Sequence, residues 1–193
     1  MASLLKTLTT KARSGSAFKS FSTKARDWFM TNVNNLRVNR SVMLKDDATT
    51  KRSRFLPGRM YMFFYDPKTK KTLPYYDRFP LALLIGPAPG GYYGLNLHYL
   101  HPRIRAILLD RLMSYSTGKD DNLRLKLSYN LLKASSRLRA FKPCFKHYLK
   151  KHIRSRMVEV EATNWETAIF LPTERFVGAS KSEVYQDSVE SII

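Results

Sequence analysis

Large apolar residues are densest between positions 55 and 112, where they fall into short runs separated by turn-forming residues. Asp66 and Pro67 predict a turn after the first run, because proline presets φ and aspartate bonds the backbone just ahead of it. The prolines and glycines at 86–91 predict a break after the second run. Short aromatic or β-branched runs joined by turns are typical of an antiparallel meander. The predicted strands are residues 60–65, 79–85 and 92–99.

The first and third runs are apolar at nearly every position, so we expect both faces of the sheet to be covered. His101 and Pro102 begin a predicted helix, because proline at the first helical position loses no hydrogen bond. Apolar residues then recur near helical spacing through Met113. Strands followed by a packed helix predict an α+β fold with a small antiparallel core, for which we prefer an SH3-like barrel over a meander.

Two helices are predicted in the segment that follows. Asp120 or Asp121 can cap a helix that continues to about residue 135, although residues 123–129 also alternate like a strand. Phe145, Leu149 and Ile153 lie four apart, which predicts a helix over residues 141–153 with one buried stripe.

The C-terminal region carries three shorter signals. Residues 157–161 alternate as a strand, and residues 163–166 match a capping box that predicts a helical turn over 164–169. Ser180 is placed to cap a last, acidic helix through residue 189. Trp165, Ile169 and Phe176 are expected to return to the core.

Residues 1–31 form a basic amphipathic segment with no acid before Asp27. Three functions fit this pattern: an arm that orders on a partner or on nucleic acid, a helix on a membrane surface, and an organellar transit peptide. An ordinary surface helix is the fourth alternative. We expect the arm to be helical and to contact its partner through aromatic residues, namely Phe18, Phe21, Trp28 and Phe29.

The net charge of +19 is segregated along the 193 residues. Residues 1–60 carry 13 basic and 3 acidic groups, net +10, and residues 61–118 carry 7 and 3, net +4. Residues 119–157 carry 12 and 2, net +10, whereas residues 158–193 carry 2 and 7, net −5. We therefore predict an arm and linker at 1–54 and an α+β domain at 55–193, with a basic helical insertion at 119–157 and an acidic tail.

A strongly basic chain fits nucleic acid, an acidic protein surface or anionic lipid as its partner. The alternative is that the basic side chains only solvate exposed helix faces. No apolar run is long enough to span a bilayer. Of the possible partners, a membrane is the one that we expect least. The residues predicted to contact nucleic acid or an acidic partner are Lys11, Arg13, Lys24, Arg26, Arg52, Arg54, Lys68, Lys70, Lys71, Arg137, Arg139, Lys150 and Lys151.

No residue pattern names a reaction. A single cysteine, Cys144, excludes an intramolecular disulfide and is expected to be a buried apolar side chain. The four histidines lack metal-ligand spacing, and Asp66 and Asp77 read as turn residues. Tyrosines on or near the strands offer rings for base stacking, but a tyrosine-rich core or interface explains them better. We expect no catalytic residue, metal, cofactor or small-molecule substrate.

Three blocks of the chain resemble a family of small virion proteins of large contractile-tailed bacteriophages. The blocks are YDPKTKKTLPYYDRFPL at 65–81, GLNLHYLHPRIRAILLDRL at 94–112 and AIFLPTERFVGASKSEVYQDS at 168–188. The likeness extends over about residues 55–190 and implies a part of the virion in the tail, baseplate or neck. The roles attached to the family are structural, tail-associated or related to DNA ends, and the resemblance implies no catalytic residues.

The leading hypothesis is therefore a non-enzymatic structural component of the virion, assembled in the host cytoplasm. Its basic arm and tyrosine-rich core would bind other virion subunits. The alternative is a DNA-binding protein that holds a genome end, or DNA in the tail lumen.

Overall fold

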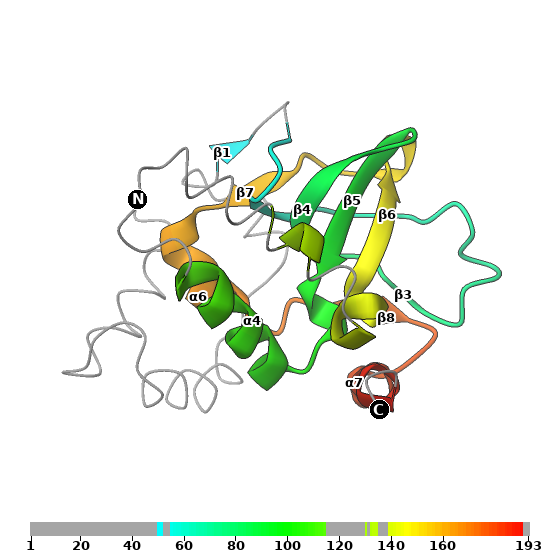
Figure 1. The fold of residues 1–193 in the computed structure, drawn as a ribbon. Helices are drawn as coiled ribbons and strands as arrows, with labels where there is room; N and C mark the ends of the chain where they lie inside the picture. Colours follow the sequence, from blue (N-terminus) through cyan, green and yellow to red (C-terminus); the bar gives the residue numbers. More distant parts are fainter. Residues whose placement is uncertain (1–49, 52–54, 115–129, 131, 135–138, 191–193) are drawn as a thin grey trace.

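The computed structural model describes residues 50–51, 55–114, 130, 132–134 and 139–190. Within these residues an antiparallel sheet of six strands, in the order β1-β7-β2-β4-β5-β6, carries helices on one side (Figure 1). A second, two-stranded sheet pairs β3 with β8. The fold is therefore α+β, as predicted.

The strands and helices follow one another closely, with several short 3-10 turns (η). In order they are β1 Thr50–Lys51, β2 Met60–Met62, β3 Tyr76–Asp77, β4 Leu81–Ala88, β5 Gly91–Asn96, η1 Leu97–Tyr99, α4 Pro102–Ser114, η2 Arg139–Cys144, β6 Phe145–Leu149, η3 Lys150–His152, β7 Val158–Val160, η4 Ala162–Asn164, α6 Trp165–Ala168, β8 Phe176–Val177 and α7 Lys181–Glu190.

The six-stranded sheet curls, but no continuous ladder closes it into a barrel within the described residues. After β6 the chain turns back at η3 and meets the end of the β2 segment through a single bridge between Tyr65 and Ile153. Two backbone hydrogen bonds flank the bridge, from Arg154 N to Phe64 O at 2.8 Å and from Asp66 N to His152 O at 3.0 Å. Of the two predicted cores, the meander describes this sheet better than the barrel.

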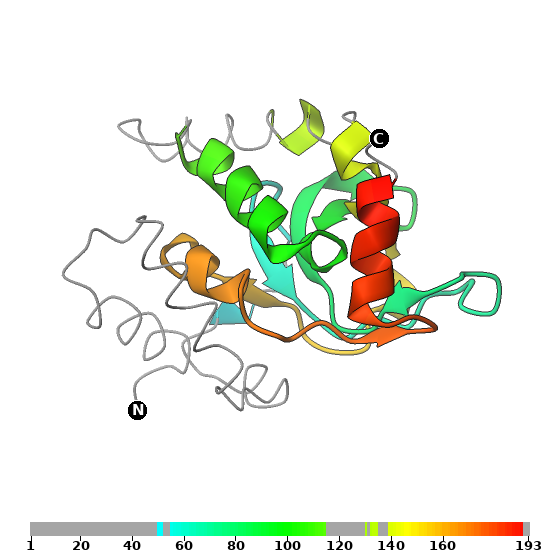
Figure 2. The same ribbon diagram turned by 90° about the horizontal axis from the view of Figure 1, so that it is seen from below.

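Both faces of the sheet are buried, as the apolar runs predicted. On one face Met60, Met62, Leu83 and Leu95 belong to a large apolar cluster that also includes side chains of α4, α6 and α7. Figure 2 shows α4 and α7 on either side of the η1 turn. The other face carries a smaller, aromatic cluster that contains Tyr61, Phe63, Tyr65, Leu84 and Tyr148.

The predicted break at 86–91 lies later than expected, because β4 continues to Ala88. A register shift between Leu84 and Gly86 and the exposed Pro87 mark the end of the strand. Pro87 lies beyond the residues that pair with β2, so its missing N–H interrupts no ladder on that side. The turn then leads into Gly91, where a Cβ would lie 1.9 Å from the carbonyl oxygen of Tyr148, so glycine is required for β5 and β6 to pair.

The helix predicted over residues 141–153 is wrong. The segment forms η2, the strand β6 and η3, and β6 pairs antiparallel with β5. A spacing of four satisfies an alternating strand as well as a helix, so Phe145 and Leu149 did not distinguish the two. Tyr148 decides between them: it is buried on the aromatic face, while Phe145 stacks on Tyr93 on the other face.

The remaining helix predictions within the described residues hold. Helix α4 begins at Pro102, although Ile107 is 54% exposed rather than buried. The Ser180 hydroxyl accepts from Glu183 N, and the Glu183 carboxylate accepts from Ser180 N, which forms the cap of α7. Trp165 and Ile169 are buried in the large apolar cluster, and Phe176 packs against the same cluster. Most of the helix predicted up to residue 135, and the whole arm at 1–49, lie outside the described residues.

A buried arginine joins these elements. Arg105 on α4 is 1% exposed. Its guanidinium donates to three backbone oxygens, those of Leu100 at 2.7 Å, Ile169 at 2.9 Å and His98 at 3.2 Å. It also donates to the Tyr185 hydroxyl of α7 at 2.8 Å. One side chain thus links α4, the η1 turn, the end of α6 and α7.

We expect Arg105→Met to lower the free energy of unfolding by about 3–5 kcal/mol, because three buried carbonyls and a phenol lose their donor together. Chemical denaturation of the full chain measures this change. Arg103→Met is the matched control, since Arg103 is exposed on the same helix, and it should change stability by less than about 0.5 kcal/mol. Equal effects of the two substitutions would contradict the role assigned to Arg105.

Candidate nucleic-acid interface

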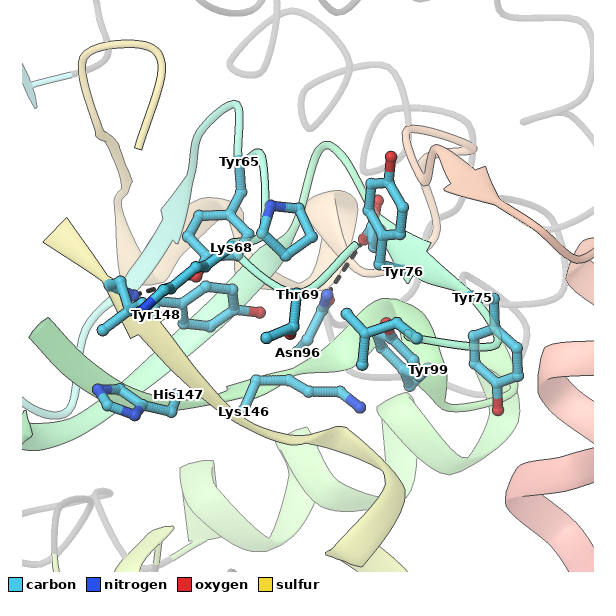
Figure 3. Close-up of a pocket in the computed structure, with 14 residues that line it drawn as sticks. Tyr65, Lys68, Thr69, Tyr75, Tyr76, Asn96, Tyr99, Lys146, His147 and Tyr148 are labelled. Atoms are coloured by element: carbon cyan, nitrogen blue, oxygen red, sulfur yellow. Dashed lines mark hydrogen bonds between the residues drawn. The ribbon is translucent and has the colours of Figure 1, made fainter. Parts of the chain in front are cut away.

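A cavity of about 170 Å³ opens on the aromatic face of the sheet, between β6, the end of β5 and the segment 65–77 (Figure 3). Its walls combine tyrosines with basic and small polar side chains. The lining residues are Tyr65, Pro67, Lys68, Thr69, Leu73, Tyr75, Tyr76, Asp77, Asn96, Tyr99, Lys146, His147, Tyr148 and Leu149.

Strand alternation places the polar groups of β6 in this cavity. Lys146 and Tyr148 are two residues apart and therefore share a face. Gly94 lies opposite Lys146 in the register, and a Cβ there would lie 3.3 Å from Leu84 and 3.5 Å from the Tyr148 ring. The absence of a side chain at Gly94 leaves the space next to which the Tyr148 ring and Leu84 pack.

Lys146 is largely buried, and its ammonium lies 3.9 Å from the centroid of the Tyr99 ring. Burial lowers the pKa of Lys146 from its usual value of 10.5. A cation over a ring face gains electrostatic attraction, but a ring is a weaker partner than an anion. No carboxylate in the described part of the chain forms an ion pair with Lys146.

Most of the tyrosine hydroxyls around the cavity are engaged. Tyr65 accepts from Leu149 N at 3.1 Å, and Tyr75 forms a hydrogen bond with the side chain of Asp187. Burial and the neighbouring Asp187 carboxylate raise the pKa of Tyr75 to about 12. The hydroxyl of Tyr148 is different: it is buried and has no hydrogen-bond partner among the described residues. Burial raises the pKa of Tyr148, so this group is a neutral phenol that can donate.

Two exposed basic segments flank the cavity, and we call residues 66–73 and 150–154 together the basic rim. The rim carries six lysines and arginines and one acid, Asp66. Asp66 pairs with Lys70 at 2.9 Å and with Arg154 at 3.7 Å. The Tyr65–Ile153 bridge and the hydrogen bond from Asp66 N to His152 O hold the two segments side by side, although they are more than 75 residues apart in sequence.

The structure thus brings together five of the predicted contact residues, namely Lys68, Lys70, Lys71, Lys150 and Lys151, and Lys68 also lines the cavity. Arg139 is the first residue of η2 and lies outside the rim. The other predicted contacts lie outside the described residues; they are Lys11, Arg13, Lys24, Arg26, Arg52, Arg54 and Arg137, as are the interface residues Phe18, Phe21, Trp28 and Phe29.

Lys146 and Tyr148 were not among the contact residues predicted from the sequence. The helix predicted for this segment placed Lys146 on an exposed face, whereas a strand turns it inward beside Tyr148. The signal that could have indicated a strand here is the alternation of Lys146 and Tyr148 soon after Pro143. The rings proposed for base stacking are largely core, since Tyr61, Tyr65 and Tyr99 are buried.

Asp77 is also more than the turn residue that the sequence suggested. It does accept from Phe79 N at 2.9 Å, as a turn aspartate does, but it is 3% exposed. It also accepts from Arg175 N at 3.0 Å and contacts His98 Nδ1 at 2.7 Å. Burial alone would raise the pKa of Asp77, but His98 and the two backbone donors outweigh it and hold the pKa below its usual value.

His98 connects Asp77 to Thr173, because its Nδ1 contacts Asp77 and its Nε2 is 3.2 Å from the Thr173 hydroxyl. This order resembles a hydrolytic triad, but His98 and Thr173 are both 0% exposed. A nucleophile must reach its substrate. The contacts among Asp77, His98 and Thr173 instead hold η1, β3 and the segment before β8 together. Cys144 is buried as predicted, and burial raises the pKa of its thiol to about 12.

The described residues contain no group of three histidine, cysteine, aspartate or glutamate side chains placed to hold a metal ion. None of the helices in the described ranges is long and apolar enough to cross a bilayer. The exposed lysines of the basic rim, together with Lys146 in the cavity, make this the surface at which a polyanion would be attracted electrostatically.

Comparison with known protein families shows to which family the chain belongs. A family model described as phage T4 terminal DNA protecting protein matches residues 2–189, so the chain belongs to this family and is a protein of a T4-like phage. No curated protein and no solved structure matches. The resemblance to phage proteins is therefore confirmed, while a place in the tail, baseplate or neck gains no support from the comparison.

We expect acid to destabilise the protein through Asp77. Because the pKa of Asp77 is lower in the folded state than the value of about 3.9 in the unfolded chain, the unfolded state binds more protons below about pH 4. The stability that Asp77 contributes is complete above that pH and is lost as the pH falls through the folded pKa. Denaturation midpoints measured from about pH 2.5 to about pH 7, a range that brackets the ordinary pKa of an aspartate, should show this loss.

Asp77→Asn should flatten the acid limb of this pH profile, because asparagine does not titrate. A variant whose stability falls with acid as steeply as that of the natural chain would show that other carboxylates govern the limb. Circular dichroism at neutral pH checks that the variant is folded before the comparison is made.

Proposed function

We propose that this protein binds the ends of phage DNA and shields them by occupying them, without catalysis. The observation that carries the proposal is the match of residues 2–189 to the family of terminal DNA protecting proteins. The basic rim supports it, because lysines grouped on one surface neutralise neighbouring phosphates and release their counterions.

DNA binding was the alternative interpretation of the sequence, and the family match favours it over the leading hypothesis of an assembly role in the tail, baseplate or neck. The charge distribution fits the same conclusion. Residues 1–60 carry net +10 in addition to the basic groups of the rim, so two basic regions are available for one polyanion. Binding to other virion subunits and a location in the virion stay predictions.

A preference for ends is the direct test. We expect the full chain to bind linear duplex DNA more tightly than a covalently closed circle of the same sequence and length, and to slow digestion of the linear duplex by an exonuclease. Band-shift titration and a digestion time course measure the two effects. Equal affinity for the linear and closed forms would show general DNA binding and would contradict end protection.

If the basic rim contacts DNA, substitutions of its lysines should change the affinity for DNA and its salt dependence. Lys150→Gln combined with Lys151→Gln should weaken DNA binding and reduce the slope of log affinity against log salt by about 0.9 for each phosphate that is no longer neutralised. The matched control is Arg103→Gln combined with Lys133→Gln, which removes two exposed charges outside the rim. If both double variants change the slope equally, the binding is spread over the surface and the rim is not the interface.

A further inference from the structure

The cavity below the basic rim has two groups that a ligand would satisfy. Lys146 carries a largely buried ammonium that lies over the Tyr99 ring. Tyr148 carries a buried hydroxyl with no hydrogen-bond partner in the described residues. A buried donor without an acceptor is unfavourable, and the Tyr148 hydroxyl is such a donor. It lies in one cavity with an ammonium that has no ion pair among the described residues, so the two groups need an explanation beyond folding.

The geometry around these groups favours an anion. Figure 3 shows the Tyr148 hydroxyl directed to the middle of the cavity and the Lys146 side chain extended along its floor. Lys68 and Thr69 add an ammonium and a hydroxyl from the rim segment. The one carboxylate of the lining, Asp77, already accepts from Phe79 N, Arg175 N and Asn96 and contacts His98.

The size of the cavity narrows the choice of anion. At about 170 Å³ it is smaller than the ~300–1,000 Å³ typical of sites that enclose a drug-sized ligand. A phosphate group fits the donor set, since lysine binds phosphate as a point charge and hydroxyls donate to its oxygens. A phosphate inside a DNA strand is flanked by sugars on both sides, whereas a phosphate at a strand terminus can enter a small cavity alone.

We propose that this cavity binds the terminal phosphate of a DNA end, with Lys146 and Tyr148 as its principal donors and Lys68 and Thr69 at its mouth. The proposal rests on the proposed function and extends it, because it names the chemical group by which an end is distinguished from the rest of the duplex. The rim then holds the adjacent internal phosphates.

The test uses the full chain and four DNA probes of one sequence: linear duplexes with 5′-phosphate, with 3′-phosphate or with hydroxyls only, and a covalently closed circle. We expect one of the phosphorylated ends to bind at least about 10-fold more tightly than the hydroxyl ends, as expected for charge-assisted hydrogen bonds. Equal binding of all three linear probes, each tighter than the circle, would overturn the terminal-phosphate site and leave end protection standing. Equal binding of all four probes would contradict both.

Tyr148→Phe is the sharpest variant, because it removes only a hydroxyl that has no partner among the described residues, and the fold should be retained. It should lower the affinity for the phosphorylated end more than the affinity for hydroxyl ends, and so reduce the preference between them. Lys146→Gln should also reduce the preference for the phosphorylated end. Tyr61→Phe is the matched control: Tyr61 is buried on the same face of the sheet, but its hydroxyl accepts from Leu56 N at 3.1 Å and it does not line the cavity.

Inorganic phosphate and deoxyadenosine monophosphate distinguish a DNA terminus from a free phosphate. Competition at concentrations near those of the DNA probe would show that the cavity takes free phosphate and would overturn the proposal. Competition only at large excess supports it, because the rim then contributes binding that a free anion lacks. A preference for phosphorylated ends that survives in both Tyr148→Phe and Lys146→Gln would place the recognition elsewhere.

Discussion

The fold depends on a chain of buried polar contacts that runs from Arg105 to Asp77. Arg105 donates to the backbone oxygen of His98, and the His98 ring contacts Asp77. Asp77 in turn accepts from the backbone just after β3 and just before β8. A buried charge is costly unless hydrogen bonds or an opposite charge compensate it. The Arg105 guanidinium donates to four neutral acceptors, and Asp77 accepts from backbone donors and contacts His98. These contacts fix η1, β3, α4 and α7 relative to the sheet.

The cavity is a consequence of that arrangement. Asn96 and Tyr99 belong to the η1 region, which the polar chain holds, while Lys146 and Tyr148 come from the paired strand β6. The cavity therefore lies between an element positioned by buried charges and an element positioned by strand pairing. Its donors need little reorganisation to meet a ligand, and preorganised donors bind anions more strongly than mobile ones.

Local patterns in the sequence predict part of the fold. The strand β2, the helix α4 and the cap of α7 follow from apolar runs, a proline and a capping box. The prediction for segment 141–153 failed because a spacing of four fits two periods, and only the pairing of β6 with the distant β5 chooses between them. Asp77, Lys146 and Tyr148 gain their environment from partners far away in the sequence, which no local pattern contains.

The two halves of the basic rim are joined mainly through the main chain. The Tyr65–Ile153 bridge and the flanking bonds between Asp66 and His152 and between Arg154 and Phe64 involve backbone atoms. Backbone spacing of this kind is independent of which side chains project from it. The lysines of this surface can thus be replaced while the backbone that displays them keeps its shape, so the charge of the surface and the shape of the fold are separable properties.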